Sequence, residues 1–159
     1  MSRTRSHAAR SLSVIALLVV FASGCSDSTV AEPESGVTIA DLVGSWKASS
    51  VLFTNKANTS QQFDIIAAGG ELRVTVLNHG GARTWLDIGP VSDEWDAQLT
   101  VSGNQITSVP VESTRPTRHF TVELDGNRLT LTSSDATFDF TLSNGIELPA
   151  TEVTVLVRN

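Results

Sequence analysis

From Trp46 to the C-terminus, the chain repeatedly alternates apolar and polar side chains. Successive side chains of a β-strand point to opposite faces of a sheet, so this period of two predicts strands with one buried and one wet face. Gly-containing turns at 102–104, 125–127 and 144–145 separate several of these segments, as in β-hairpins. We therefore predict an all-β fold, either an antiparallel barrel or a sandwich. The alternating segments are residues 46–52, 71–77, 94–101, 119–124, 128–132, 137–142 and 153–157.

The residues directly before the first alternating segment favour a single helical turn. Thr38 is followed three positions later by Asp41, which is the spacing of a capping box with Asp in place of the usual Glu or Gln. Leu42 and Val43 are then available to pack inward, and Gly44 ends the turn. We predict a short N-terminal helical turn over residues 38–43.

The first 24 residues have the composition of a secretory signal. Arg3, Arg5 and Arg10 form a basic start, and residues 12–21 form an apolar run that only Ser13 interrupts. This run is too short to cross a bilayer as a helix, which takes about 20 apolar residues. We expect residues 1–24 to be removed and to take no part in the fold.

The end of this signal, Ala-Ser-Gly-Cys at residues 22–25, resembles the lipobox of bacterial lipoproteins. The resemblance implies that Cys25 carries acyl chains such as palmitate, with an ordinary secretory signal and an incidental cysteine as the alternative. Two or more chains anchor a protein stably without a transmembrane helix. In this family, Ser26 instead of Asp after the cysteine implies delivery to the outer membrane, facing the periplasm. The membrane is then a partner through the lipid alone.

The segment after the cysteine is small, polar and acidic, and it has no apolar period. We expect a flexible tether, with an unpaired first strand as the alternative. The predicted organisation is a lipoprotein signal peptide at 1–24, a lipidated cysteine and tether at 25–37, and a β-barrel domain at 38–159.

Composition excludes several functions. The chain has 11 basic and 17 acidic residues and a net charge of −6, whereas nucleic-acid binding needs clustered Lys and Arg. Its single cysteine rules out an intramolecular disulfide and a Cys-rich zinc site. His79 and His119 are too few and too far apart to suggest a metal site or a catalytic triad, and Glu94 and Asp96 share the wet face of a strand. We expect no nucleic-acid partner, no metal, no cofactor and no enzymatic activity.

Gly44-Ser45-Trp46, just after the helical turn, and the stretch from Phe138 to Arg158 are similar to bacterial lipocalin-like domains. The resemblance implies an antiparallel up-and-down β-barrel of about eight strands. It also implies that Trp46 plugs the closed end, that Gly44 lets the chain pass close to it, and that Arg158 packs across the indole. An exposed terminal arginine is the alternative for Arg158.

A barrel of eight strands is either filled by side chains or holds one small ligand, and the sequence leaves both outcomes open. No Lys or Arg falls clearly on the inward positions, since Lys47, Arg73 and Arg128 alternate outward and Arg115 and Arg118 lie in a small basic loop. A buried carboxylate would need a cation, so we expect any ligand to be small, neutral and hydrophobic. The inward positions that we expect to line a pocket are Ala48, Ser50, Leu52, Val74, Trp95, Phe120, Phe138 and Phe140.

Residues 54–70 form a long connector with a polar start and apolar residues at Phe63, Ile65 and Ile66. Loops of this length are uncommon unless they are functional, so the connector either packs its apolar residues onto the barrel or closes over a cavity as a lid. Two functions are compatible with these features. The leading hypothesis is a lipid-anchored, lipocalin-like envelope protein that binds a small neutral hydrophobic ligand. The alternative is an envelope protein-interaction module, such as a protease inhibitor or assembly factor.

Overall fold

The computed structural model describes residues 36–142 and 145–159. The predicted signal peptide, Cys25 and all of the predicted tether except its last two residues lie outside the described residues. The described chain begins at Gly36, whose backbone lies against that of Gly103 in the turn between two strands.

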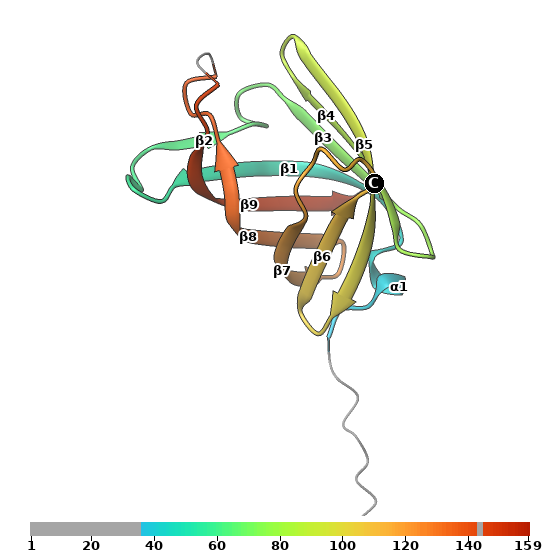
Figure 1. The fold of residues 1–159 in the computed structure, drawn as a ribbon. Coiled ribbons are helices and arrows are strands. Elements are labelled where there is room, and N and C mark those ends of the chain that lie inside the picture. The colour runs from blue at the N-terminus through green and yellow to red at the C-terminus, as the bar shows by residue number, and fades with distance from the viewer. Residues whose placement is uncertain (1–35, 143–144) are drawn as a thin grey trace, which may run out of the picture. The chain divides into compact units, whose positions relative to one another are not determined.

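The described residues form one short helix, α1, and nine strands (Figure 1). The elements are α1 (Ile39–Leu42), β1 (Gly44–Asn55), β2 (Gln62–Asp64), β3 (Glu71–Val76), β4 (Gly81–Ile88), β5 (Val91–Ser102), β6 (Gln105–Pro110), β7 (Arg118–Asp125), β8 (Arg128–Phe138) and β9 (Leu148–Arg158).

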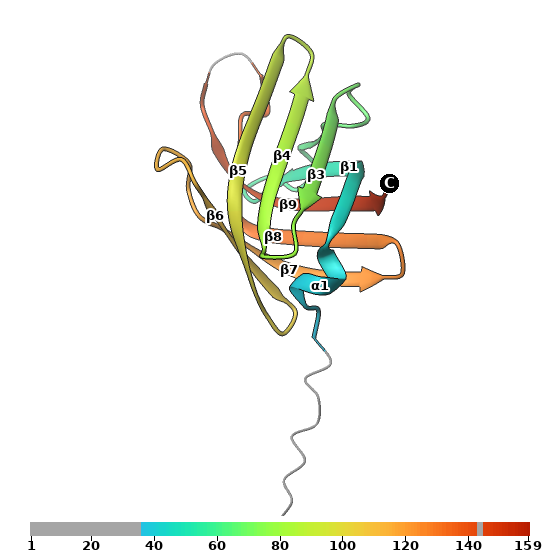
Figure 2. The same ribbon diagram turned by 90° about the vertical axis from the view of Figure 1, so that its right-hand side faces the viewer.

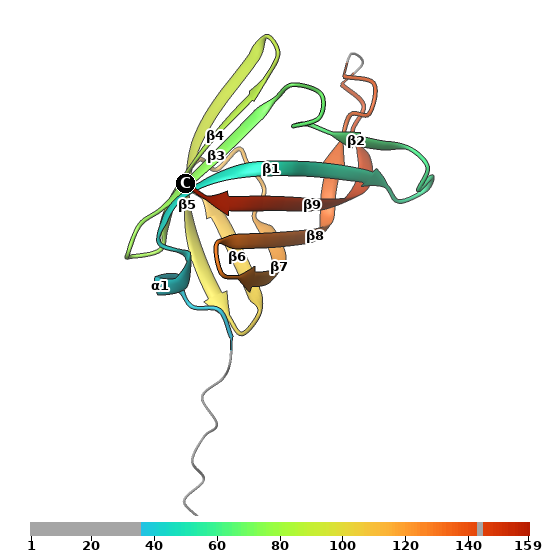
Figure 3. The same ribbon diagram turned by 180° about the vertical axis from the view of Figure 1, so that it is seen from behind.

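Eight of the strands close into an antiparallel up-and-down barrel. Each strand from β3 to β9 pairs with the next one along the chain, β3 pairs with the start of β1, and β9 pairs with β1 to complete the ring (Figures 1 and 3). The remaining strand, β2, lies outside this ring and pairs with the end of β1. In Figure 2, strands β3, β4 and β5 cross in front of β1, β9, β8 and β7 at a steep angle. The predicted all-β barrel of about eight strands is confirmed.

The predicted helical turn is also present. The Thr38 backbone N–H and hydroxyl donate to the Asp41 carboxylate at 2.9 and 2.6 Å. These bonds lower the pKa of Asp41, with a smaller contribution from the charge of Arg158. The turn buries Leu42 in the core, where it contacts the first strand. No helix in the described part of the chain is long and apolar enough to cross a membrane.

A β-bulge in β1 changes which side chains point inward. The pairing with β9 slips between Ala48 and Ser50, which leaves Ser49 as an extra residue. An extra residue reverses the alternation of every side chain that follows it. Trp46 is therefore buried before the bulge, whereas Val51 and Phe53 are buried after it. The prediction that Ser50 and Leu52 point inward is wrong because it carried one alternation through the whole strand.

Strand β8 contains a second irregularity. Its pairing with β9 slips between Ser133 and Ala136, so one strand replaces what the sequence predicted as two separate segments. The strand ends at Phe138, and Leu142 has a positive φ of 53°. The expected strand over 137–142 is therefore wrong beyond Phe138.

Candidate functional site: a cavity inside the barrel

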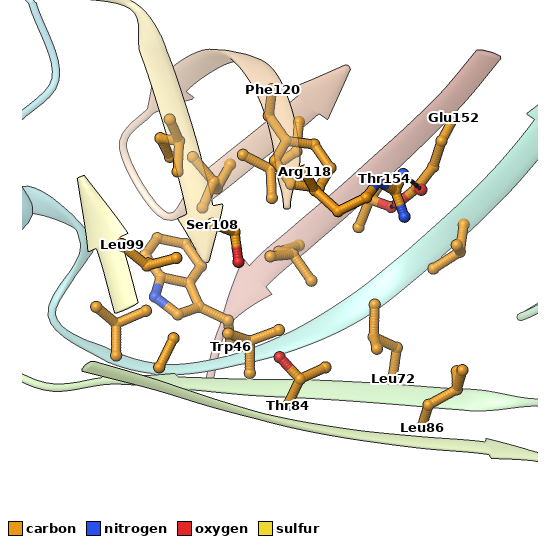
Figure 4. Close-up of a pocket in the computed structure, with 18 of the residues that line it drawn as sticks. Trp46, Leu72, Thr84, Leu86, Leu99, Ser108, Arg118, Phe120, Glu152 and Thr154 are labelled. Atoms are coloured by element: carbon orange, nitrogen blue, oxygen red, sulfur yellow. Dashed lines mark hydrogen bonds and ion pairs between the residues drawn. The ribbon is translucent and has the colours of Figure 1, made fainter. Parts of the chain in front are cut away.

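The barrel encloses a cavity of about 220 Å³. Every strand of the ring contributes to its wall, together with α1 and the connector that precedes β3. The wall is mostly aliphatic and aromatic, and its charged side chains, Arg118 and Glu152, lie together with Thr154 on one side of it (Figure 4). The lining residues are Leu42, Trp46, Val51, Phe53, Ile65, Leu72, Val74, Val76, Ala82, Thr84, Leu86, Trp95, Leu99, Ile106, Ser108, Arg118, Phe120, Leu129, Leu131, Glu152, Thr154 and Leu156.

One end of the cavity, which we call the closed end, is built around Trp46. Its side chain is 1 % exposed, and its Nε1–H donates to the Leu42 carbonyl at 2.7 Å. The Arg158 guanidinium lies 4.3 Å from the indole centroid. It donates to the carbonyls of Asp41 and Val43 at 2.7 and 2.5 Å. The arginine therefore ties the last strand to the helical turn across the face of the indole.

Gly44 is required at the closed end for two reasons. Its φ of 132° is a conformation that side-chain-bearing residues rarely adopt. A Cβ atom at this position would also lie 2.9 Å from Nη1 of Arg158. The structure thus places Gly44, Trp46 and Arg158 together, in the arrangement that the lipocalin resemblance implied for them.

The opposite end, which we call the mouth, carries an ion pair. Nη2 of Arg118 donates to Oε2 of Glu152 at 2.6 Å, and the Thr154 hydroxyl donates to Oε1 of the same carboxylate at 2.8 Å (Figure 4). Glu152 is only 8 % exposed. The Arg118 guanidinium also lies 5.4 Å from the Phe120 ring. A buried carboxylate is costly unless it is paired, and Arg118 supplies the pairing charge for Glu152 in the wall.

A second carboxylate faces Arg118 without a hydrogen bond. Oδ1 of Asp135 lies 3.9 Å from Nε of Arg118, and this Nε is buried with no hydrogen-bond partner. Burial raises the pKa of Asp135, but the Ser133 hydroxyl and the charge of Arg118 outweigh that effect and lower it. Asp135 therefore remains a carboxylate beside the mouth.

Arg118 corrects the expectation that no cation points into the barrel. Strand β7 begins at Arg118, which shares the inward side with Phe120 and Val122, instead of lying in a loop. The alternating segment that the sequence predicts here begins at His119. Extending it back by one residue would have placed this arginine inside, and that is the signal that sequence reasoning missed.

The predicted pocket residues divide into two groups. Val74, Trp95 and Phe120 line the cavity. The prediction is wrong for the other five, because none of them is among the residues that line the cavity. These five are Ala48, Ser50, Leu52, Phe138 and Phe140. Ala48 is buried within the packed core, and the Ser50 hydroxyl donates to Asp64 at 2.7 Å on the β2 side.

The two phenylalanines that follow the β8 bulge belong to an aromatic cluster behind the cavity wall. Phe138 stacks on Phe53 at 4.3 Å and on Phe63 at 5.3 Å, and Phe140 meets it edge-on at 5.2 Å. Of these rings, Phe53 lines the cavity. The cluster supports the wall on the mouth side, since Phe53 is paired with Glu152.

The connector over 54–70 joins this cluster and the wall. Ile65 is buried and lines the cavity, so the connector packs apolar residues onto the barrel. Asp64 holds it in place by accepting from the Ser50 hydroxyl at 2.7 Å and from the N–H groups of Ile66 and Ala67 at 2.9 and 3.2 Å. Burial raises the pKa of Asp64, but these bonds and one from Val51 N–H outweigh that effect and lower it.

A second arginine fixes Trp95 in the wall. Arg115 lies 4.7 Å from the indole centroid and donates to both carboxylate oxygens of Asp93 at 2.7 and 2.8 Å. Cation–π contacts of this kind contribute about 0.5–2 kcal/mol. The loop between β6 and β7 is thereby attached to β5 through Asp93 and Trp95.

Among the residues that the structure describes, no group of three or more His, Cys, Asp or Glu side chains is arranged to hold a metal ion. No family model matches the chain, and neither a curated protein nor a solved structure matches it. The geometry of the cavity is therefore the basis for any functional conclusion.

Proposed function

We propose that this chain is a lipid-anchored envelope protein whose barrel binds one small hydrophobic molecule. The observation that supports the proposal is the cavity of about 220 Å³ with its largely apolar wall. An apolar cavity of about 150 Å³ binds benzene, which has six heavy atoms. By proportion, this one suits a molecule of about nine heavy atoms. Such a molecule gains about 25 cal/mol for each Å² of apolar surface that leaves water.

A pair of phenylalanine substitutions tests ligand binding. Thr84→Phe places a ring where the Thr84 side chain points into the cavity (Figure 4), whereas Thr100→Phe adds the same ring on an exposed position of β5. The barrel has its own hydrophobic core, so a chain of residues 26–159 is suitable. Octan-1-ol, with nine heavy atoms, is titrated calorimetrically. We expect affinity to fall at least tenfold in Thr84→Phe and to be unchanged in Thr100→Phe. Equal affinity in both variants contradicts a ligand inside the barrel.

The lipid anchor is supported by the basic start, the apolar run and Cys25 of the sequence. Cys25→Ser removes the acceptor of the acyl chains. In bacteria grown with labelled palmitate, we expect the native chain to be labelled and to fractionate with outer membranes, and the variant to be unlabelled. A native chain that stays unlabelled contradicts the lipid anchor and does not bear on ligand binding in the cavity.

A protein-interaction module is a second candidate because apolar side chains are exposed on the outer face of the barrel. Val111 is 74 % exposed, and together with Leu77 it lines a groove over β3, β4 and β5. Crosslinking in membranes is expected to trap a partner at this groove if that function holds, and Val111→Ser together with Leu77→Ser to abolish the crosslink.

A further inference from the structure

The Arg118 guanidinium has hydrogen-bonding capacity that the fold does not use. An arginine side chain offers five N–H donors. Among the described residues, Arg118 donates a single hydrogen bond, from Nη2 to Glu152, and its buried Nε lacks an acceptor. Nearly all buried polar groups in proteins have a partner, so unused guanidinium donors on a residue that lines the cavity suggest a missing acceptor.

The charges around Arg118 restrict what that acceptor is. Glu152 lies 2.6 Å and Asp135 lies 3.9 Å from guanidinium nitrogens, so the formal charges of the three side chains sum to one negative charge. An anionic head group would approach two carboxylates at short range, where repulsion in a poorly solvated site is strong. An ammonium head group would be attracted by the carboxylates, but it has no lone pair to accept from Arg118.

We infer that the bound molecule is a neutral amphiphile with a small hydroxyl-type head group on Arg118 and an apolar tail directed toward Trp46. A hydroxyl accepts from the guanidinium and donates to a carboxylate oxygen of Glu152 or Asp135, so it matches both kinds of group in the mouth. The tail lies along the aliphatic wall, which runs from the mouth to the closed end (Figure 4). This inference rests on the proposed function and specifies the ligand class for the same cavity.

Three ligands with the same eight-carbon chain test it: octan-1-ol, octanoate and octylammonium. Calorimetric titration of the chain of residues 26–159 at neutral pH measures each affinity. We expect octan-1-ol to bind at least tenfold more tightly than either charged ligand. A hydrogen bond to a charged group is worth about tenfold or more in affinity.

Two variants separate the roles of the guanidinium and the carboxylates. Arg118→Lys keeps the charge but removes Nε–H and the planar guanidinium. We expect it to lower the affinity for octan-1-ol about tenfold. Glu152→Gln removes one negative charge beside Arg118, and we expect octanoate to gain at least tenfold. Circular dichroism and the urea midpoint establish that both variants are folded. If Arg118→Lys is destabilised, the Glu152→Gln switch toward octanoate still tests the charge argument.

The outcomes distinguish this inference from the proposed function. If all three ligands bind with equal affinity and Thr84→Phe abolishes binding, the cavity is a binding site and the head-group inference is wrong. Tighter binding of octanoate than of octan-1-ol by the native protein also overturns it. If none of the three ligands binds, both proposals fail.

Discussion

The two ends of the barrel each place an arginine on an aromatic ring, and the two arginines differ in what their N–H groups meet. At the closed end, Arg158 lies 4.3 Å from the Trp46 centroid and donates to two backbone carbonyls of the helical turn. At the mouth, Arg118 lies 5.4 Å from the Phe120 centroid, donates to Glu152 and leaves its Nε without an acceptor. Residue type alone does not distinguish the two arginines. They differ in how many of their N–H donors meet an acceptor within the fold.

The difference follows from the neighbours that each strand brings. β9 ends beside the helical turn. A helix of one turn leaves its last carbonyls without intrahelical partners, so they are available to Arg158. β7 begins beside the β8 bulge and the inward carboxylate of β9, so its arginine meets charge instead of backbone. The donors of Arg158 are thus satisfied within the fold, whereas Arg118 keeps unused donors at the mouth.

Truncation of Trp46 should cause the largest loss of stability, because it removes the side chain that fills the closed end. Trp46→Ala removes a fully buried indole and its bond to Leu42, and a loss of about 3–5 kcal/mol in the free energy of unfolding is expected. Urea denaturation measures it. Trp85→Ala is the control because Trp85 is half-buried and does not line the cavity. Equal losses in the two variants would contradict the role of Trp46 as the plug.

Replacing the arginines by methionine should separate stability from binding. Arg158→Met leaves the carbonyls of Asp41 and Val43 without their donor and removes the contact with the indole. We therefore expect a loss of about 1–3 kcal/mol in the free energy of unfolding and an unchanged affinity for octan-1-ol. Arg118→Met combined with Glu152→Met removes the ion pair as a unit. Such replacements are neutral or stabilising in many proteins, so stability should hold while affinity falls about tenfold.

The comparison between the ends is wrong if these effects are exchanged. A folded Arg158→Met protein that loses ligand affinity, beside a double variant that keeps it, would locate the polar subsite at the closed end.

Substitution of Asp64 should cause a smaller loss of stability, because Asp64 fixes only the connector on the mouth side. Asp64→Asn weakens the bonds that hold the connector, and a loss of about 1–2 kcal/mol is expected at neutral pH. Because the folded pKa of Asp64 lies below its ordinary value of 3.8, the native carboxylate stabilises the fold above that pH and loses this contribution as the pH falls below it. Urea midpoints of the native and variant chains should therefore converge on acidification.

Asp125→Asn, at the exposed last residue of β7, is the control for the Asp64 experiment. A difference between native and Asp64→Asn chains that grows on acidification would show that the carboxylate is not what fixes the connector.

Sequence periodicity was sufficient for the architecture but insufficient for the site. The alternation around Trp95, Val74 and Phe120 placed these side chains correctly on the wall. It failed for Ser50 and Leu52 after the β1 bulge. It also missed β4, whose inward Thr84 interrupts the apolar pattern. One extra residue reverses the facing of a strand, and a local pattern does not reveal where that residue lies.

The amino-acid sequence by itself determined that this chain forms strands, because the period of its apolar residues matches a pleated backbone, and it determined the helical turn through Thr38 and Asp41. Tertiary structure decided where the bulges fall, that the barrel keeps a cavity, and that Arg118 shares its mouth with Glu152 and Asp135. These features depend on the pairing of β1 and β8 with β9 and on the contacts of Arg118 with Asp135 and Glu152. These contacts join residues far apart in the chain, so no local pattern records them.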